Sequence, residues 1–288
     1  MKRFIKSKYI EEQGDGQFEE DSFALPRLDK MGLNLDNWDH VVALAGNPNT
    51  GKSTVFNKLT GLRQHTGNWP GKTVSRAEGG FNYGDRSYKL VDLPGTYSLL
   101  ASSVEEEIAR NFILFGQPDV TIVVADATRL QRNLNLVLQI LEITDRAILC
   151  LNLMDEAERH GLEIDEEQLS ADLSIPVVPT VARQGIGFDK LLQTVDKVAR
   201  KEIQGKRYRV ENEPEVVSKA LDEVEQQILQ QYPGLPNARW LALRLLDNDE
   251  KIVEAFENNE IERLRKLMDQ QPLDLKKELE AINKEQRN

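Results

Sequence analysis

The stretch Gly46-Asn-Pro-Asn-Thr-Gly51-Lys52-Ser53 decides the fold of this 288-residue chain. It matches the pattern G-x-x-x-x-G-K-[ST], in which a glycine-rich turn presents backbone N–H groups to phosphate oxygens. The apolar run Val41–Ala45 precedes it and predicts a buried strand, and a helical pattern, Lys52–Leu62, follows it. Strand, turn and helix in this order are the context that the motif requires. The sequence therefore predicts a P-loop domain.

The residues of this motif have separate expected tasks. The turn and the positive end of the following helix would face the phosphates, Lys52 would reach the β- and γ-phosphates, and Ser53 would ligate Mg²⁺. The nucleotide contacts expected from this stretch are Gly46, Asn47, Pro48, Asn49, Thr50, Gly51, Lys52, Ser53 and Thr54.

Strand and helix patterns alternate outward from the motif. Further strands are predicted at Thr73–Tyr83, Ser87–Asp92, Val120–Asp126, Ala147–Asn152 and Pro176–Thr180. Helices are predicted at Val104–Phe115, Arg132–Ile143, Asp165–Leu173 and Phe188–Lys201, with a capping box at Ser103 and Glu106 for the first of these. This alternation predicts an α/β fold with helices on both faces of the sheet.

The strand patterns stop after about Glu202. Successive helices are predicted at Pro214–Gln231, Asn237–Leu246, Asp249–Asn258 and Ile261–Gln270. We therefore expect an α/β domain at residues 40–203, a small all-helical domain at 204–272 and a polar tail at 273–288. Residues 1–39 are expected to form an N-terminal arm without an assigned role, loosely attached at 11–39 because no periodicity is sustained there.

Composition limits the classes of function. The chain has 37 basic and 48 acidic residues, a net charge of −11, and the acidic excess would repel nucleic acid. No apolar stretch approaches the ~20 residues of a membrane-spanning helix, and no apolar segment of a signal peptide follows the basic N-terminus. The single cysteine, Cys150, lies in an apolar run and is expected to be buried in a reducing cytoplasm. His40, His65 and His160 lack the spacing of metal ligands.

Two further motifs follow predicted strands. Asp92-Leu-Pro-Gly95 comes about forty residues after the P-loop, where Asp92 would help hold Mg²⁺ and the N–H of Gly95 would approach the γ-phosphate. In Asn152-Leu-Met-Asp155, the Asp155 carboxylate can accept two hydrogen bonds from guanine, which adenine does not offer. Alone, the second motif is equally compatible with a helix cap, but the other motifs favour GTP or GDP.

The loop after the last predicted strand completes the expected base site. Val181-Ala182-Arg183 occupies the place from which guanine-binding proteins present a backbone N–H to the base. The nucleotide contacts expected beyond the P-loop are Asp92, Gly95, Asn152, Met154, Asp155, Val181, Ala182 and Arg183.

Several segments together resemble one family. They are Gly67–Gly71 with Thr73, Asp92–Leu99, Asp126–Leu134 and Asn152–Ala157. These segments look like the cytoplasmic G domain of the bacterial ferrous-iron transport protein B (FeoB) family. The resemblance covers about residues 40–200, and residues 204–272 resemble the family's helical, GDI-like domain.

This resemblance implies a Ras-like P-loop GTPase that binds GTP and Mg²⁺. It places switch I at about Arg63–Arg76, with Thr73 as a second protein ligand of Mg²⁺, and starts switch II at Asp92. It also implies a transmembrane iron-permease region of the same polypeptide, absent from these residues, and a place at the cytoplasmic face of the bacterial inner membrane. A homo-oligomer is compatible with the sequence.

Hydrolysis would have to proceed without the glutamine that many such enzymes place after D-x-x-G, because Thr96 and Tyr97 stand there. We expect backbone groups of the switches to position water, and turnover to be slow. In FeoB-like GTPases an Asn at the position of Asn49 helps to hold K⁺, with switch I carbonyls near Asn68 and Trp69. The expected catalytic residues are Lys52, Asn49, Thr73 and Gly95.

The function expected is a regulatory GTPase coupled to ferrous-iron uptake. Two alternatives stay open: an Era-like ribosome-assembly GTPase, and a non-hydrolysing GTP-dependent interaction module. The Era-like alternative would need a basic face or a KH-type module. GTP turnover by the purified protein would distinguish the regulatory GTPase from the non-hydrolysing module. The helical domain directly follows the helix Phe188–Lys201, and the family resemblance implies that it restrains GDP release.

Overall fold

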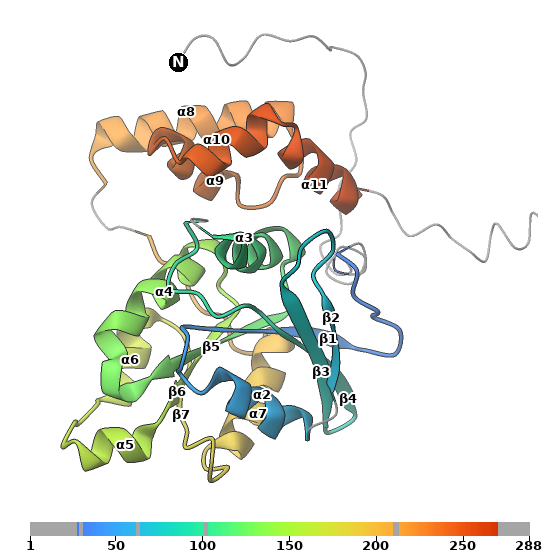
Figure 1. The fold of residues 1–288 in the computed structure, drawn as a ribbon. Coiled ribbons are helices and arrows are strands. Elements are labelled where there is room, and N and C mark those ends of the chain that lie inside the picture. Colours follow the sequence, from blue (N-terminus) through green and yellow to red (C-terminus); the bar gives the residue numbers. More distant parts are fainter. Residues whose placement is uncertain (1–27, 29–30, 62–63, 101–102, 210–212, 270–288) are drawn as a thin grey trace, which may run out of the picture.

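The computed structural model describes residue 28 and residues 31–61, 64–100, 103–209 and 213–269 (Figure 1). The predicted polar tail at 273–288 and the first part of the arm lie outside these residues. The described residues form an α/β domain built on a seven-stranded mixed sheet, followed by a helical region. The predicted fold class is confirmed.

The sheet has the order β2-β3-β4-β1-β5-β6-β7. The strands are β1 (His40–Gly46), β2 (Gln64–Asn68), β3 (Ser75–Tyr83), β4 (Arg86–Asp92), β5 (Val120–Asp126), β6 (Ala147–Asn152) and β7 (Val177–Pro179). The strands from β4 to β7 in this order run parallel, while β2 and β3 pair antiparallel at one edge. The carboxyl ends of the parallel strands therefore meet at one edge, where ligands bind in open α/β sheets.

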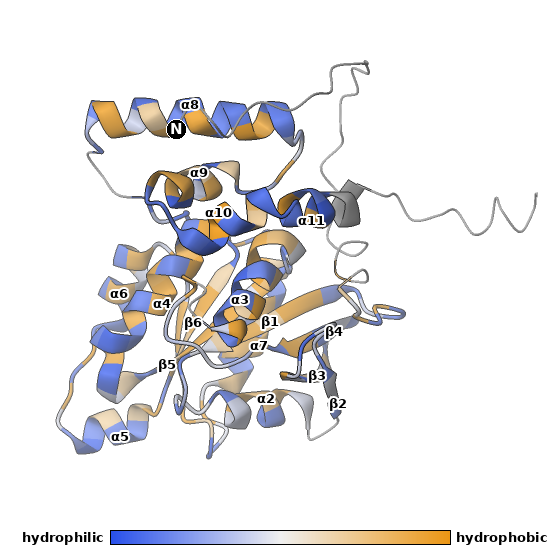
Figure 2. Cartoon of the chain, turned by 45° about the horizontal axis from the view of Figure 1, so that its top comes forward, coloured by the Kyte–Doolittle hydropathy of each residue, from blue (hydrophilic) through white to orange (hydrophobic). Residues whose placement is uncertain are grey.

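Helices cover both faces of the sheet. One face carries α2 (Lys52–Thr60) and α7 (Phe188–Ala199), and the other carries α3 (Val104–Asn111), the π-helical turn η1 (Phe112–Gly116), α4 (Leu130–Ile143) and α6 (Glu166–Leu173). The short α5 (Met154–Arg159) follows β6, and η2 (Ala127–Arg129) follows β5. Side chains of β1 alternate between the two cores, because successive residues of a strand face opposite sides. Figure 2 shows these apolar strands between helices with hydrophilic outer faces.

The helical region lies over α3, η1 and α4 (Figure 1). It consists of α8 (Glu215–Gln231), α9 (Ala238–Leu246), α10 (Glu250–Glu257) and α11 (Glu260–Asp269). Asn237 Nδ2 donates to the Leu114 carbonyl at 3.1 Å, and Arg244 forms an ion pair with Glu142 on α4 at 3.3 Å. The helical region follows α7 in the chain, but these two contacts show that it packs on η1 and α4. Among helices of the described ranges, none combines the length and the hydrophobicity that crossing a membrane needs.

Most of the expected elements are present with small shifts at their ends. The helix predicted at Val104–Phe115 changes to a π-helical turn after Asn111, and Ser103 caps it by accepting a hydrogen bond from the Glu106 N–H at 3.2 Å. Cys150 is fully buried, as predicted, and burial raises the pKa of its thiol to about 11.

The sequence patterns miss one strand in the first seventy-five residues, and one expectation there is wrong. The strand β2 was not expected, because Gln64–Asn68 is polar and exposed along its whole length and shows no apolar pattern. The arm is not loosely attached in its described part, since Leu28 and Leu33 are 0% and 1% exposed and belong to the main core. Both features depend on contacts with distant residues, which local periodicity does not report.

Candidate functional site

The turn between β1 and α2 has the shape of a P-loop. Thr50 Oγ1 donates to the Asn47 carbonyl at 2.9 Å and closes the turn. Gly51 has a left-handed φ of +85°, and a Cβ at this position would lie 2.3 Å from Asn152 Nδ2. Position 51 therefore requires glycine both for its backbone conformation and for its closeness to β6. Asn49 is also left-handed, with a φ of +68°, and its side chain is exposed.

Asn152, at the end of β6, joins this turn to the loop after β7. Its Nδ2 donates to the Thr50 carbonyl at 3.0 Å, and its Oδ1 accepts from the Ala182 N–H at 3.0 Å. The residue is only 1% exposed. The side chain predicted to contact nucleotide thus binds two backbone segments of the site, and Ala182 uses its N–H for this link.

Lys52 and Asp92 face one another across the β1–β4 side of the site. Lys52 Nζ, at the start of α2, pairs with Asp92 Oδ1 at the end of β4. Burial raises the pKa of the Asp92 carboxyl, and the Lys52 ammonium opposes that shift. Each charge compensates the other in a partly buried place, so a phosphate for Lys52 and a cation for Asp92 are the partners that could replace the pair.

The segment after Asp92 is attached to the P-loop through its backbone. The Thr96 N–H donates to the Gly46 carbonyl at 3.3 Å, and the Thr96 side chain is buried. Gly95 lies beside Pro48. A Cβ at position 95 would lie 3.6 Å from Pro48, an ordinary contact distance, so the packing here does not require glycine. The side chain that replaces the usual glutamine is therefore turned into the protein and is not placed to orient water.

A cavity of about 310 Å³ adjoins the P-loop. Its lining comes from the P-loop, from Tyr97, from the end of β5 and start of α4, and from Leu153 and Glu156: Asn47, Pro48, Asn49, Thr50, Tyr97, Asp126, Thr128, Arg129, Arg132, Asn133, Leu153 and Glu156. Asn47 Nδ2 is buried and has no hydrogen-bond partner within the described residues. The Arg132 guanidinium lies 4.6 Å from the centre of the Tyr97 ring. The cavity thus offers an unpaired donor and two guanidinium groups to an anionic ligand, alongside the carboxylates of Asp126 and Glu156.

The residues expected to recognise guanine lie at the ends of neighbouring strands. Asp155 is half-buried in the first turn of α5, after β6, and its carboxylate lies 3.5 Å from the Arg159 guanidinium. The Met154 N–H donates to the Thr180 carbonyl at 3.3 Å, which ties α5 to the loop that continues with Val181 and Ala182. Val181 and Ala182 are buried, while Arg183 is exposed.

The structure does not gather Thr73 with the other expected Mg²⁺ ligands. Thr73 is exposed in the turn between β2 and β3, where the Trp69 N–H donates to the Val74 carbonyl at 3.0 Å. Lys72, its neighbour, pairs with Glu107 on α3 at 3.1 Å. Of the three residues expected to hold Mg²⁺, Ser53 at the start of α2 and Asp92, which pairs with Lys52, lie at the P-loop, and oxygen donors are what Mg²⁺ prefers.

Sequence reasoning missed Arg129 and Arg132 as residues of the site. Both belong to the segment Asp126–Leu134, whose family pattern was noticed, but nothing in that pattern says that the start of α4 borders the P-loop. Within the ranges that the structure describes, no group of three or more His, Cys, Asp and Glu side chains could hold a metal ion.

Comparison with known protein families extends these observations. The profile of "Ferrous iron transport protein B" matches residues 40–195, and that of the "FeoB cytosolic helical domain" matches residues 214–288. This chain belongs to the FeoB family. The Fe(2+) transporter FeoB of Shigella flexneri is 42% identical over 217 residues, which make up 72% of this chain and 27% of that protein. The chain therefore spans about a quarter of the length of this FeoB relative.

Solved FeoB structures share the fold and the domain order. The cytosolic domain of T. maritima FeoB in a GDP form aligns with a TM-score of 0.69 and 36% identity, covering 80% of this chain and 96% of that one. The GMPPNP form of the same domain gives 0.68 and 36%, with the same coverage. The cytosolic domain of L. pneumophila FeoB gives 0.66 and 32%, covering 79% and 96%.

The link made by Asn152 can be tested directly. Asn152→Ala leaves the Thr50 carbonyl and the Ala182 N–H without their partner, so we expect the free energy of unfolding to fall by about 2 kcal/mol. Urea denaturation measures this loss, and hydrogen exchange should show the Ala182 amide losing protection. Asn133→Ala is the matched control, because Asn133 is also buried but bonds to the Arg129 carbonyl. Equal protection of Ala182 in both variants would contradict the assigned link.

Proposed function

We propose that this chain is the GTP-binding and GTP-hydrolysing regulatory part of a ferrous-iron transporter, acting at the cytoplasmic face of the bacterial inner membrane. The observation that carries this proposal is the Lys52–Asp92 pair beside a P-loop that Asn152 ties to the loop 181–183. The names of the FeoB relatives support the transport role, and the T. maritima domain, solved in GDP and GMPPNP forms, supports guanine nucleotide as the ligand.

Nucleotide binding would exchange one set of charge pairs for another. Lys52 would leave Asp92 for the phosphates, while Ser53 and Asp92 would supply oxygen ligands to Mg²⁺, which neutralises phosphate charge when bound. The P-loop N–H groups and the start of α2 would face the phosphates. Asp155 would accept from the guanine base, with the loop Val181–Arg183 on its other side. Thr73 would join the Mg²⁺ ligands only after its turn leaves α3.

Hydrolysis would depend on backbone groups and on a monovalent cation. The Thr96 side chain is buried, so water would be positioned by N–H groups of the switches, Gly95 among them. Asn49 is an exposed residue of the P-loop, and its amide oxygen is the kind of ligand that hard cations take. A positive charge at this place can contribute ~10³–10⁵ in rate where another protein supplies an arginine. We therefore propose slow turnover that K⁺ stimulates.

The remaining parts of the proposal concern partners. Guanine nucleotide is the small-molecule partner, and a transmembrane iron-permease region of the same polypeptide is the proposed protein partner. Family membership favours this role over an Era-like ribosome-assembly GTPase. Measured GTP turnover by the purified chain tests the enzyme assignment. Tight GTP binding without turnover would instead favour the non-hydrolysing module.

The helical region is proposed to restrain GDP release through α3 and α4. Arg110 of α3 is buried, and burial lowers the pKa of its guanidinium. The carboxylates of Asp249, Glu107 and Glu260 oppose this shift, and Asp249 and Glu260 belong to the helical region. The Arg244–Glu142 pair joins α9 to α4, and α4 begins beside the P-loop cavity. If the helical region packs better on the occupied domain, it must by linkage tighten nucleotide binding by the same factor.

Guanine specificity is expected to depend on Asp155. Asp155→Asn replaces two acceptor oxygens by a donor and an acceptor. GTP should therefore bind at least tenfold more weakly, and xanthosine triphosphate should bind more tightly than it does to the parent. A competition titration against a fluorescent guanine nucleotide measures both. Glu156→Gln, a change at the next carboxylate, should leave the preference for GTP intact. An Asp155→Asn protein that still prefers GTP as strongly as the parent would refute the assignment.

K⁺ stimulation is expected to require Asn49. Replacing Na⁺ by K⁺ at constant ionic strength should raise the rate of GTP hydrolysis, and Asn49→Ala should remove most of that rise. Thr96→Ala should matter far less, because its side chain is buried away from the reacting groups. Equal rates in the two salts would rule out the cation role.

GDP release is expected to quicken when the helical region is loosened from α4. Arg244→Ala breaks the ion pair to Glu142, and we expect release of a fluorescent GDP analogue to speed up several-fold in stopped-flow, with hydrolysis less affected. Arg239→Ala is the control on the same helix, because Arg239 pairs with Glu213 and Asp222 within the helical region. Identical release from both variants and the parent would make the helical region a spacer.

A further inference from the structure

The described part of the N-terminal arm, Leu28 and residues 31–39, is bound to the segment that holds switch I. Arg76 of β3 donates from Nη1 to the Met31 carbonyl at 3.2 Å and from Nη2 to the Gly32 carbonyl at 2.7 Å. The same guanidinium lies 5.3 Å from the centre of the Trp69 ring and pairs with Glu78 at 2.7 Å. One side chain thus contacts the arm, β3 and switch I together.

Apolar contacts fasten the arm over the same region. Leu28 and Leu33 are buried in the core cluster that also contains Trp69 and Phe112. A Cβ at Gly116 would lie 2.6 Å from the Leu28 side chain, so the arm sits directly on η1. The Trp69 and Phe112 rings meet edge to face with centroids 5.6 Å apart. Trp69 of switch I is therefore held in the core between the arm and η1.

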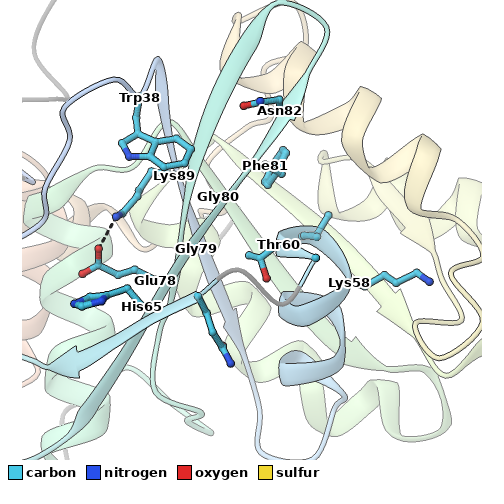
Figure 3. A pocket seen from close by; sticks show the side chains of 13 residues that line it. Trp38, Lys58, Thr60, His65, Glu78, Gly79, Gly80, Phe81, Asn82 and Lys89 are labelled. Atoms are coloured by element: carbon cyan, nitrogen blue, oxygen red, sulfur yellow. Dashed lines mark ion pairs between the residues drawn. The ribbon is translucent and has the colours of Figure 1, made fainter.

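The other end of the arm is anchored on the outer strands. The Trp38 ring lies against Gly80 so closely that a Cβ there would overlap it, and Lys89 stands 5.6 Å from the centre of this ring (Figure 3). Lys89 also pairs with Glu78 at 2.6 Å. Asp39 accepts hydrogen bonds from the N–H and hydroxyl of Ser87 at the start of β4. The arm crosses β3 and is fixed at both ends.

We propose that the arm is a strap, and that Arg76 is the positioning residue through which it holds switch I in the β2–β3 hairpin and away from the P-loop. This inference rests on the proposed function, in which Thr73 ligates Mg²⁺ beside the γ-phosphate. With the strap in place, the ratio of GDP affinity to GTP affinity would be higher than the P-loop alone would give.

The physical reason is a competition between two positions of switch I. To bring Thr73 to Ser53 and Asp92, the turn must leave Glu107 and Trp69 must leave the core, which separates it from Arg76. In GTPases the γ-phosphate and Mg²⁺ order this segment, and GDP does not require it. Contacts that exist only in the hairpin position stabilise it. GTP binding must break them, so the affinity for GTP falls by the free energy that they contribute, while the affinity for GDP is unchanged.

The test compares variants of the 288-residue chain by their affinity for fluorescent GMPPNP and GDP in Mg²⁺. Arg76→Gln removes both bonds to the arm, and Leu33→Ala weakens the arm without touching β3. Each should raise the affinity for GMPPNP relative to GDP, by about tenfold for Arg76→Gln. Arg76→Lys keeps a charge for Glu78 but cannot bind both carbonyls, so its shift should be smaller. Arg86→Gln is the control, because Arg86 pairs with Asp196 on α7 instead.

A second measurement reports on switch I without nucleotide. The amides of Trp69 and Lys72 donate within the turn, to the Val74 and Trp69 carbonyls, and are protected while the hairpin persists. Hydrogen exchange at both should quicken in Arg76→Gln and Leu33→Ala and stay unchanged in Arg86→Gln. Adding Thr73→Ala to Arg76→Gln should abolish the gain for GMPPNP, because that gain requires Thr73 at the cation.

The outcomes separate the strap from the proposed function. If exchange quickens but the preference between GMPPNP and GDP stays as in the parent, the strap does not govern nucleotide choice and the inference is overturned. A fall in relative GMPPNP affinity, or a gain that survives Thr73→Ala, overturns it as well. Failure of the parent chain to bind either nucleotide would refute the proposed function itself, before any variant is compared, and the inference with it.

Discussion

The buried side-chain amide of Asn152 holds the candidate site together, because it donates one hydrogen bond to the P-loop and accepts another from the loop after β7. The P-loop and the loop after β7 are separate turns, and turns at the edge of a sheet are free to move relative to one another. Asn152 bonds to the backbone of both, and Gly51 lies too close to this amide to carry a side chain. The relative placement of Lys52 and Asp155, which we propose to bind opposite ends of the nucleotide, therefore depends on one side chain of β6.

The two charges that face each other at the P-loop, Lys52 and Asp92, compensate one another. Asp92 is partly buried, and burial alone would favour its neutral form, but the Lys52 ammonium beside it favours the carboxylate. A buried pair contributes little to stability, yet leaving either member without a partner is costly. In the proposed function, a ligand that brings an anion for Lys52 and a cation for Asp92 would replace both partners at the same time.

The helical region and the N-terminal arm, both outside the α/β domain, pack close to the segments expected to be the switches. The helical region contacts η1 and α4, and the arm contacts η1 and the strand that follows switch I. The two bodies thus meet the element η1 from different parts of the chain. A shift of switch I or of α3 changes the contacts of both, which is the physical basis on which either could bias nucleotide binding.

The sequence by itself determined the alternation of strands and helices, the P-loop, the positions of Asp92 at the end of β4 and of Asp155 just after β6, and the run of helices that follows α7. Those features follow from local periodicity, from turn chemistry and from motif spacing. Tertiary structure decided the rest: the polar strand β2, which exists because β3 pairs with it, and the burial of Leu28 and Leu33, which depends on Trp69 and η1. The position of Thr73 away from Ser53 is of the same kind. It follows from the packing of Trp69 against Phe112 and from the Lys72–Glu107 ion pair, which join residues far apart in the chain.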